Sequence, residues 1–223
     1  MTKTANSLAR TTPPVRVSFP NVFEKRAAMQ GGTPSYSVRL MIDKANKEQM
    51  AFMKELHADM KYVQENQWPD PATRSRIPLV GHDKSPIKDG DKACNSQGIP
   101  YKEKNPELEG HYFLNAASYS DSSLVVVDER RQEILDKSKI YGGCWCKINM
   151  NVYARTRSDN PGISFGLNGV QKWGDDEALG GGRPSAENMF EAGDGRDDPS
   201  AYGGGADPFA GSSPAYPDDD IPF

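Results

Sequence analysis

Apolar and polar side chains alternate in several short segments of this 223-residue chain. Residues 15–19 and 36–42 both alternate, and the second segment places Val38, Leu40 and Ile42 on one face and Arg39 on the other. A period of two is typical of a strand with one buried face. Strand-like segments return at residues 111–117, 124–128, 140–153 and 163–173. The first 173 residues therefore predict a mainly β domain.

One long helix interrupts the strands, at residues 43–66. Its apolar side chains recur at spacings of three and four and form one stripe: Met50, Met53, Leu56, Met60 and Val63. Such a stripe is typical of a helix packed against a core. Asp43 or Asn46 could cap its start, and the pair Trp68-Pro69 ends it.

Two stretches lack a sustained period and are predicted to be loops. Residues 20–34 contain Gly31-Gly32 and the basic pair Lys25-Arg26. Residues 69–110 form a long, partly irregular excursion, and loops of this length in a compact domain are usually functional or mobile. The excursion carries seven cationic side chains: Arg74, Arg76, Lys84, Lys88, Lys92, Lys102 and Lys104. Several strands, one helix and long loops predict a small, curved antiparallel β-barrel or sandwich.

The charge of the chain is divided between a basic body and an acidic tail. The formal net charge of −4 combines +6 over residues 1–173 with −10 over residues 174–223. A basic body predicts an anionic ligand, most commonly nucleic acid, although an acidic tail can also serve solubility alone. The tail holds ten of the 21 glycines and six of the 17 prolines, so we expect it to be disordered. We therefore predict two domains, residues 1–173 and 174–223.

Composition also restricts the compartment. No apolar run approaches the roughly 18–20 residues of a membrane span, and residues 1–10 lack the apolar stretch of a secretory signal. The mean hydropathy of −0.73 indicates a polar chain. Its three cysteines are few and odd in number, which argues against a disulfide framework. We expect a soluble protein of a reduced compartment, most simply the cytoplasm, with no membrane partner.

The segment from residue 144 to 155 contains the strongest candidate binding surface. Its even positions are apolar: Cys144, Cys146, Ile148, Met150, Val152 and Ala154. Its odd positions are polar or aromatic: Trp145, Lys147, Asn149, Asn151, Tyr153 and Arg155. Because side chains alternate across a strand, the first set should enter the core and the second should line the opposite face.

This outer face suits an unpaired nucleic acid strand. Bases can stack on Trp145 and Tyr153, at roughly 1–3 kcal/mol per base, while Lys147 and Arg155 meet phosphates. The alternative is that the two rings pack under a loop. The same positive surface would be extended by Arg16, Arg39 and Arg157, if their strands neighbour this one. The basic pair Lys25 and Arg26 is also assigned to DNA binding.

The sequence contains no convincing catalytic or metal-binding set. Zinc at Cys144 and Cys146 is disfavoured, because both sit in mid-strand facing the core, where cysteine usually acts as a small hydrophobe. The phosphate-binding loop, the serine nucleophile elbow and the H-E-x-x-H motif are all absent. Asp89-Gly90-Asp91 could ligate magnesium in a nuclease but is more simply a turn. We predict no cofactor and no enzymatic activity.

Two strings carry a resemblance to a known family. They are GISFGLNGVQKW at residues 162–173, followed by LGGGR at 179–183, and VRVSFPNVF at residues 15–23. Together they resemble the single-stranded DNA-binding proteins of tailed phages, over most of residues 13–190. The resemblance implies an OB-like β-barrel that binds single strands without sequence preference and protects them in phage replication and recombination. It also implies the cytoplasm of a bacterial host.

The end of the chain carries a second resemblance. Its last six residues are Asp218, Asp219, Asp220, Ile221, Pro222 and Phe223. They resemble the acidic tip of bacterial single-stranded DNA-binding proteins, which docks onto replication, repair and recombination enzymes. Phe223 could enter an apolar pocket while the carboxylates meet basic side chains around it. The alternative is a generic acidic end.

Three functions remain in competition. The first is a sequence-independent binder of single-stranded DNA that recruits host or phage proteins through its tip, with homo-oligomerisation left open. The second is an adaptor or inhibitor that mimics the host tip and has little DNA affinity. The third is a metal-dependent nuclease.

Overall fold

The computed structural model describes residues 8–27, 32–81, 84–95, 97–157 and 160–179. The chain divides into two units, Met1–Gly182 and Arg183–Phe223, and all of the described residues belong to the first. The segment 218–223 that resembles an acidic tip lies outside the described residues.

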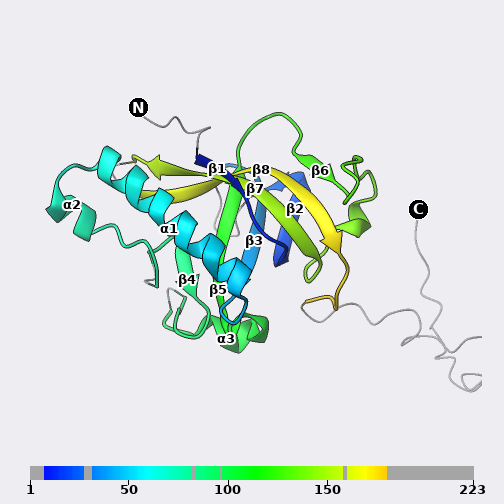
Figure 1. Cartoon of the computed structure of the whole chain (residues 1–223), viewed down its shortest axis with the longest axis horizontal. Helices are drawn as coiled ribbons and strands as arrows, with labels where there is room; N and C mark the ends of the chain where they lie inside the picture. The colour runs from blue at the N-terminus through cyan, green and yellow to red at the C-terminus, as the bar shows by residue number, and fades with distance from the viewer. Residues whose placement is uncertain (1–7, 28–31, 82–83, 96, 158–159, 180–223) are drawn as a thin grey trace, which may run out of the picture. The chain divides into compact units, whose positions relative to one another are not determined.

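The described residues contain eight strands and a few helices (Figure 1). The strands are β1 (Ala9–Thr11), β2 (Val15–Arg26), β3 (Ser35–Asp43), β4 (Ile87–Asp89), β5 (His111–Ser118), β6 (Val125–Val127), β7 (Trp145–Arg155) and β8 (Gly162–Gly174). The helices are α1 (Lys47–Gln67), α2 (Pro71–Ser75) and α3 (Tyr101–Lys104), with 3-10 turns η2 (Pro106–Leu108) and η3 (Lys137–Lys139). The predicted mainly β fold with one long helix is confirmed.

The strands form one strongly curved sheet in the order β1-β7-β2-β3-β5-β8-β6. β7 also pairs with β8, so that β2, β3, β5, β8 and β7 follow the strand order of an OB fold. The β2–β7 and β5–β8 pairings contain only two register pairs each, so the sheet is partly open rather than a fully closed barrel. Most of the pairings are antiparallel, as predicted, and the β5–β8 and β6–β8 pairings are parallel.

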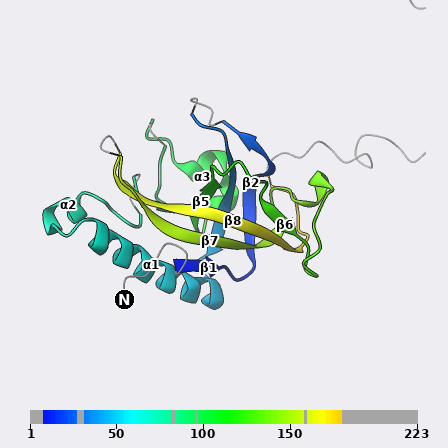
Figure 2. The same cartoon turned by 90° about the horizontal axis from the view of Figure 1, so that it is seen from above.

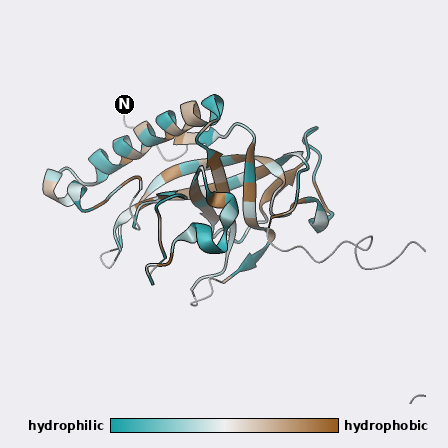
Figure 3. Cartoon of the chain, turned by 90° about the horizontal axis from the view of Figure 1, so that it is seen from below, coloured by the Kyte–Doolittle hydropathy of each residue, from teal (hydrophilic) through white to brown (hydrophobic). Residues whose placement is uncertain are grey.

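The core lies inside the curve of the sheet. Cys146, Ile148, Met150 and Val152 of β7 are each at most 1% exposed, while the odd positions of β7 are only half-buried. The alternation predicted for this strand is therefore confirmed. Figure 3 shows hydrophobic segments concentrated on the strands and hydrophilic ones on α1 and the loops.

Helix α1 covers part of this core and lies along the sheet beside β1 and β7 (Figures 1 and 2). Met53, Leu56 and Met60 of the predicted stripe are buried in the core. Asn46 is the N-cap and accepts hydrogen bonds from the backbone N–H groups of residues 48 and 49. Arg10 of β1 is ion-paired with the buried Asp59 of α1, which fastens the helix to the edge of the sheet.

The predicted loop at residues 20–34 is wrong over its first part. β2 continues through Pro20 to Arg26, with register shifts on either side of Asn21. A bulge tolerates proline because the missing N–H falls where ladder hydrogen bonds are already interrupted. Pro20 therefore marks an irregularity within one long strand and not the start of a loop.

The excursion between α1 and β5 builds a second, smaller core on the outer face of the sheet. Met41 of β3 and Phe113 of β5 point away from the main core and pack with Ala93 and Leu108. Gly90 passes so close to the backbone of Leu108 that a Cβ would lie 1.9 Å from its carbonyl oxygen. Part of the outer face is thus covered by the excursion.

The Asp89-Gly90-Asp91 sequence is a turn, as predicted. Lys44 Nζ lies 2.5 Å from Asp89 Oδ1 and 2.5 Å from Asp91 Oδ2. Asp91 also accepts a hydrogen bond from the backbone N–H of Gly110, and this bond together with Lys44 lowers the pKa of Asp91. Both carboxylates are therefore occupied in holding the excursion against the sheet.

The packing of the main core predicts a large effect of truncating Leu40. Leu40 is 0% exposed, so we expect Leu40→Ala to lower the free energy of unfolding by about 2–5 kcal/mol through the lost contacts and the cavity left behind. Leu135→Ala is the control, because Leu135 is 82% exposed and its loss should cost less than about 0.5 kcal/mol. Urea titration followed by circular dichroism measures both, and equal midpoints for the two variants would contradict this core.

Candidate nucleic-acid interface

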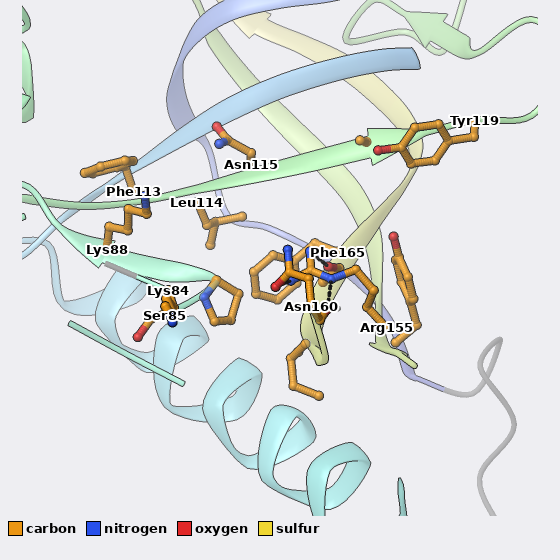
Figure 4. Close-up of a pocket in the computed structure, with 15 residues that line it drawn as sticks. Lys84, Ser85, Lys88, Phe113, Leu114, Asn115, Tyr119, Arg155, Asn160 and Phe165 are labelled. Atoms are coloured by element: carbon orange, nitrogen blue, oxygen red, sulfur yellow. Dashed lines mark hydrogen bonds between the residues drawn. The ribbon is translucent and has the colours of Figure 1, made fainter. Parts of the chain in front are cut away.

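A groove of about 470 Å³ lies on the outer face of β5, β7 and β8, beside the segment that leads into β4 (Figure 4). We call it the Arg155 groove. Three cationic side chains line it: Lys84, Lys88 and Arg155. Three aromatic side chains also line it: Phe113, Tyr119 and Tyr153. Among the described residues of its wall there are three cations and no Asp or Glu.

The pairing of β7 with β8 places Tyr153 and Arg155 in this groove. Tyr153 lies opposite Ser164 and Arg155 opposite Gly162, so both side chains reach outward over β8. Arg155 donates to the backbone oxygen of Asn160 (2.8 Å), to Asn160 Oδ1 (3.0 Å) and to Ser164 Oγ (3.3 Å). A Cβ at Gly162 would lie 3.0 Å from the Arg155 guanidinium, so glycine makes room for it. The cation is therefore held in one orientation.

Arg39 connects the Arg155 groove to the neighbouring surface. Its guanidinium lies 5.2 Å from the ring centroid of Phe113 and 4.9 Å from that of Phe19, and Nε donates to Asn115 Oδ1 at 3.3 Å. Burial lowers the pKa of Arg39, an effect that Tyr101 and Glu107 oppose. An arginine stays charged under such a shift, so Arg39 is a cation within cation–π distance of two aromatic rings.

The other end of β7 has a different environment. Trp145 Nε1 donates to Asp176 Oδ2 at 2.8 Å, and the same oxygen lies 3.4 Å from Arg16 Nε. Arg16 also donates to the backbone oxygen of Glu177 at 2.7 Å. The backbone N–H of Glu177 and the Trp145 indole lower the pKa of Asp176. The residues that follow β8 therefore engage both Trp145 and Arg16.

Lys147 lies at this same end, with Nζ 3.5 Å from the ring centroid of the half-exposed Trp173. Tyr153 is eight positions beyond Trp145, or about 26 Å along an extended strand. The predicted outer face is therefore divided, with Tyr153 and Arg155 in the groove and Trp145 and Lys147 at the far end of β7. A DNA-binding role for each of these residues stays a prediction.

The remaining predicted cations lie around the sheet. Lys25 Nζ is 2.9 Å from Asp121 Oδ1 and donates to the backbone oxygen of Tyr119, a residue of the groove. Arg26 is exposed at the end of β2, and Arg157 is exposed just beyond β7. Lys25 thus lies next to the groove.

Sequence reasoning missed several side chains that form the Arg155 groove. Lys84 and Lys88 were visible only as members of a basic excursion, because nothing in their spacing indicates which part of the sheet they reach. Phe113 and Asn115 occupy alternate positions of β5 that face outward. Their alternation with Leu114 and Ala116 was the available signal, but it was not applied to this strand.

Other candidate chemistry is limited. Cys144 and Cys146 are buried in the core with their Sγ atoms 3.6 Å apart, as expected of small hydrophobes. Across the part of the chain that the structure describes, no group of three or more His, Cys, Asp or Glu residues could hold a metal ion. No helix in that same part is long and apolar enough to cross a membrane.

Comparison with known structures shows which proteins share this fold. The single-stranded DNA-binding protein from bacteriophage Enc34, in complex with ssDNA, aligns with a TM-score of 0.61 at 23% identity, covering 78% of this chain and 90% of that chain. A C-terminally truncated form of the Enc34 protein aligns with a TM-score of 0.60, at 23% identity and over 78% and 89% of the two chains. The single-stranded DNA-binding protein gp2.5 of bacteriophage T7 aligns with a TM-score of 0.51 at 13% identity, over 83% and 96%.

Two sequence comparisons were informative to different degrees. No curated protein matches the chain by sequence. The family model of the ssDNA-binding protein of Enterobacter phage Enc34, however, matches residues 9–200, which is most of the chain. The predicted resemblance is confirmed: the chain belongs to the family of the Enc34 phage ssDNA-binding protein.

Proposed function

We propose that this protein binds single-stranded DNA without sequence preference and protects it during phage replication or recombination. The observation that carries the proposal is the Arg155 groove, which combines three cations and three aromatic rings with no carboxylate among its described lining residues. Membership of the Enc34 family supports it, as does the structural likeness to an Enc34 protein solved with ssDNA.

The groove has the features that unpaired strands require. Aromatic rings on a sheet can stack only with bases that are not already stacked in a duplex, and every base offers a π-face, so stacking favours single strands without reading sequence. Lys84, Lys88 and Arg155 supply charge for the phosphates between the stacked bases. Neither feature performs a reaction, so the proposed role is binding rather than catalysis.

We also propose that residues 218–223 recruit replication, repair or recombination proteins. The support is chemical: three aspartates precede an apolar end, Ile221-Pro222-Phe223, which suits a pocket rimmed by basic side chains. An adaptor with little DNA affinity would use the same tip. The DNA-binding protein and the adaptor differ in whether the Arg155 groove binds DNA. The variant Tyr153→Ala, described next, distinguishes them.

Removing the Tyr153 ring tests stacking in the groove. We expect Tyr153→Ala to weaken binding of a fluorescent oligo(dT) about 5- to 150-fold, which corresponds to the loss of about 1–3 kcal/mol per stacked base. Fluorescence anisotropy at constant salt measures the affinity. Trp145→Ala, measured alongside, reports whether the far end of β7 also contributes. An unchanged affinity in Tyr153→Ala would favour the adaptor.

The salt dependence of binding tests the phosphate contacts. Each neutralised phosphate of a single strand contributes a slope of about −0.7 to log K against log salt. We expect Arg155→Ala to reduce the slope by about that amount, whereas Tyr153→Ala should lower affinity with little change in slope. Arg130→Ala is the matched control, because Arg130 is exposed and does not line the groove. Equal slopes for Arg155→Ala and wild type would argue against a phosphate contact at Arg155.

Deleting residues 217–223 tests the tip. The composition predicts a disordered tail, and a flexible chain of the 44 residues after Leu179 would reach about 40 Å, enough to visit the basic body and compete with DNA. We expect the truncation to abolish capture of replication proteins in a pull-down and to leave DNA affinity equal or higher. Phe223→Ala keeps the three aspartates and should lose only the protein partners. Weaker DNA binding by the truncated protein would exclude a competing tail.

A further inference from the structure

A second cavity, of about 750 Å³, lies on the same side of the sheet as the Arg155 groove but nearer to β2. We call it the Phe19 pocket. Its wall is formed by the bulged part of β2, by the η2 turn and by the residues after β8, among them Ser18, Phe19, Lys104, Pro106, Glu107 and Leu179. None of the residues predicted from sequence to bind DNA lines this pocket.

Phe19 is presented to solvent in an unusual way. Its side chain is 59% exposed, although it belongs to a long β-strand. Its φ angle is 48°, in the left-handed region that a bulky side chain rarely adopts and that costs about 1–3 kcal/mol. The strain is consistent with a ring held outward for contact with a ligand. Arg39 supports one side of the ring.

Ser18 lacks a hydrogen-bond partner where one is needed. Its residue is 2% exposed, and its Oγ has no partner within the described part of the chain. A buried hydroxyl without a partner costs about 1–3 kcal/mol, and such groups in folded proteins usually have an explanation. Ser18 lines the Phe19 pocket, but its Oγ has almost no exposed surface, so a polar ligand would satisfy it after a change of the Ser18 rotamer.

The charge of the pocket differs from that of the Arg155 groove. Lys104, in the wall, and Arg39, next to Phe19, are opposed by Glu107 and Glu177 in the wall. The surroundings are therefore balanced, which suits an uncharged ring better than a phosphate. A nucleobase is uncharged, stacks on phenylalanine and offers donors and acceptors at its edge.

We propose that the Phe19 pocket is a nucleobase subsite, filled by one unpaired base of the strand whose neighbouring nucleotides lie in the Arg155 groove. Arg39 joins the two sites, because its guanidinium contacts Phe113 in the groove and Phe19 in the pocket. The base stacks on Phe19, and Ser18 turns its Oγ toward the pocket to bond to the edge of the base. A hydroxyl both donates and accepts, so the subsite takes any base. The inference rests on the proposed function.

A tryptophan probe at position 19 tests the stacking directly. Phe19→Trp is titrated with oligo(dT) of increasing length, and the emission of wild type, which contains three tryptophans, is subtracted. We expect the added emission to be quenched once the oligonucleotide is long enough to extend from the Arg155 groove into the Phe19 pocket. Leu135→Trp is the control, because Leu135 is exposed and lines neither site.

Affinity measurements separate this inference from the proposed function. Phe19→Ala should weaken binding of long oligonucleotides about 5- to 150-fold and leave the shortest bound ones unchanged, since those fill only the Arg155 groove. Ser18→Ala should also weaken long-strand binding, without lowering the free energy of unfolding. Binding that is intact in Phe19→Ala and unquenched in Phe19→Trp overturns the subsite while the proposed function stands. Absence of binding by wild type overturns both.

Discussion

The pairing of β7 with β8 is the constraint on which the rest of the structure depends. It contains eleven register pairs, from Trp145 opposite Gly174 to Arg155 opposite Gly162. Every second residue of β7 enters the main core, and burial of this apolar set makes a one-residue slip costly, because a slip would move all of it to the outside. The outward positions are therefore also determined, including those that carry Tyr153 and Arg155.

The outer face produced by this pairing is divided by what lies over it. At the end of β7 that carries Arg155, the surface is open, cationic and aromatic. At the Trp145 end, Asp176 and Glu177 engage the indole and Arg16, and the backbone N–H of Leu179 donates to Gly142 at 2.7 Å. A Cβ at Gly143 would lie 2.2 Å from the Glu177 carbonyl oxygen, so this turn admits the segment only because it is glycine. The first acidic residues after β8 therefore lie against the sheet, beside Trp145 and Arg16.

The excursion after α1 shapes the middle of the same face. By burying Met41 and Phe113 under Ala93 and Leu108, it converts part of an exposed sheet into a second core. Lys44 and the close approach at Gly90 hold it there. The excursion lines the Arg155 groove through Lys84 and Lys88 and lines the Phe19 pocket through residues 104–107. Arg39 lies against one ring of each site, Phe113 and Phe19. Phe113 thus belongs to the second core and also lines the Arg155 groove.

The sequence alone determined the elements with a strong local period, because alternation along β7 and the stripe along α1 reflect which face is buried wherever the element lies. It also revealed the family, through the strings at residues 15–23 and 162–173. The sequence wrongly predicted a loop from residue 20, since a bulge within a strand is recognised only from the pairing with β3. Only the tertiary structure decided which side chains line one groove. Lys84 and Lys88 lie there with Tyr153 and Arg155. Trp145, which was predicted on the same binding face, is bonded to Asp176 instead. The physical reason is that a local period specifies a face, while neighbours on that face come from strands and loops that are far apart along the chain.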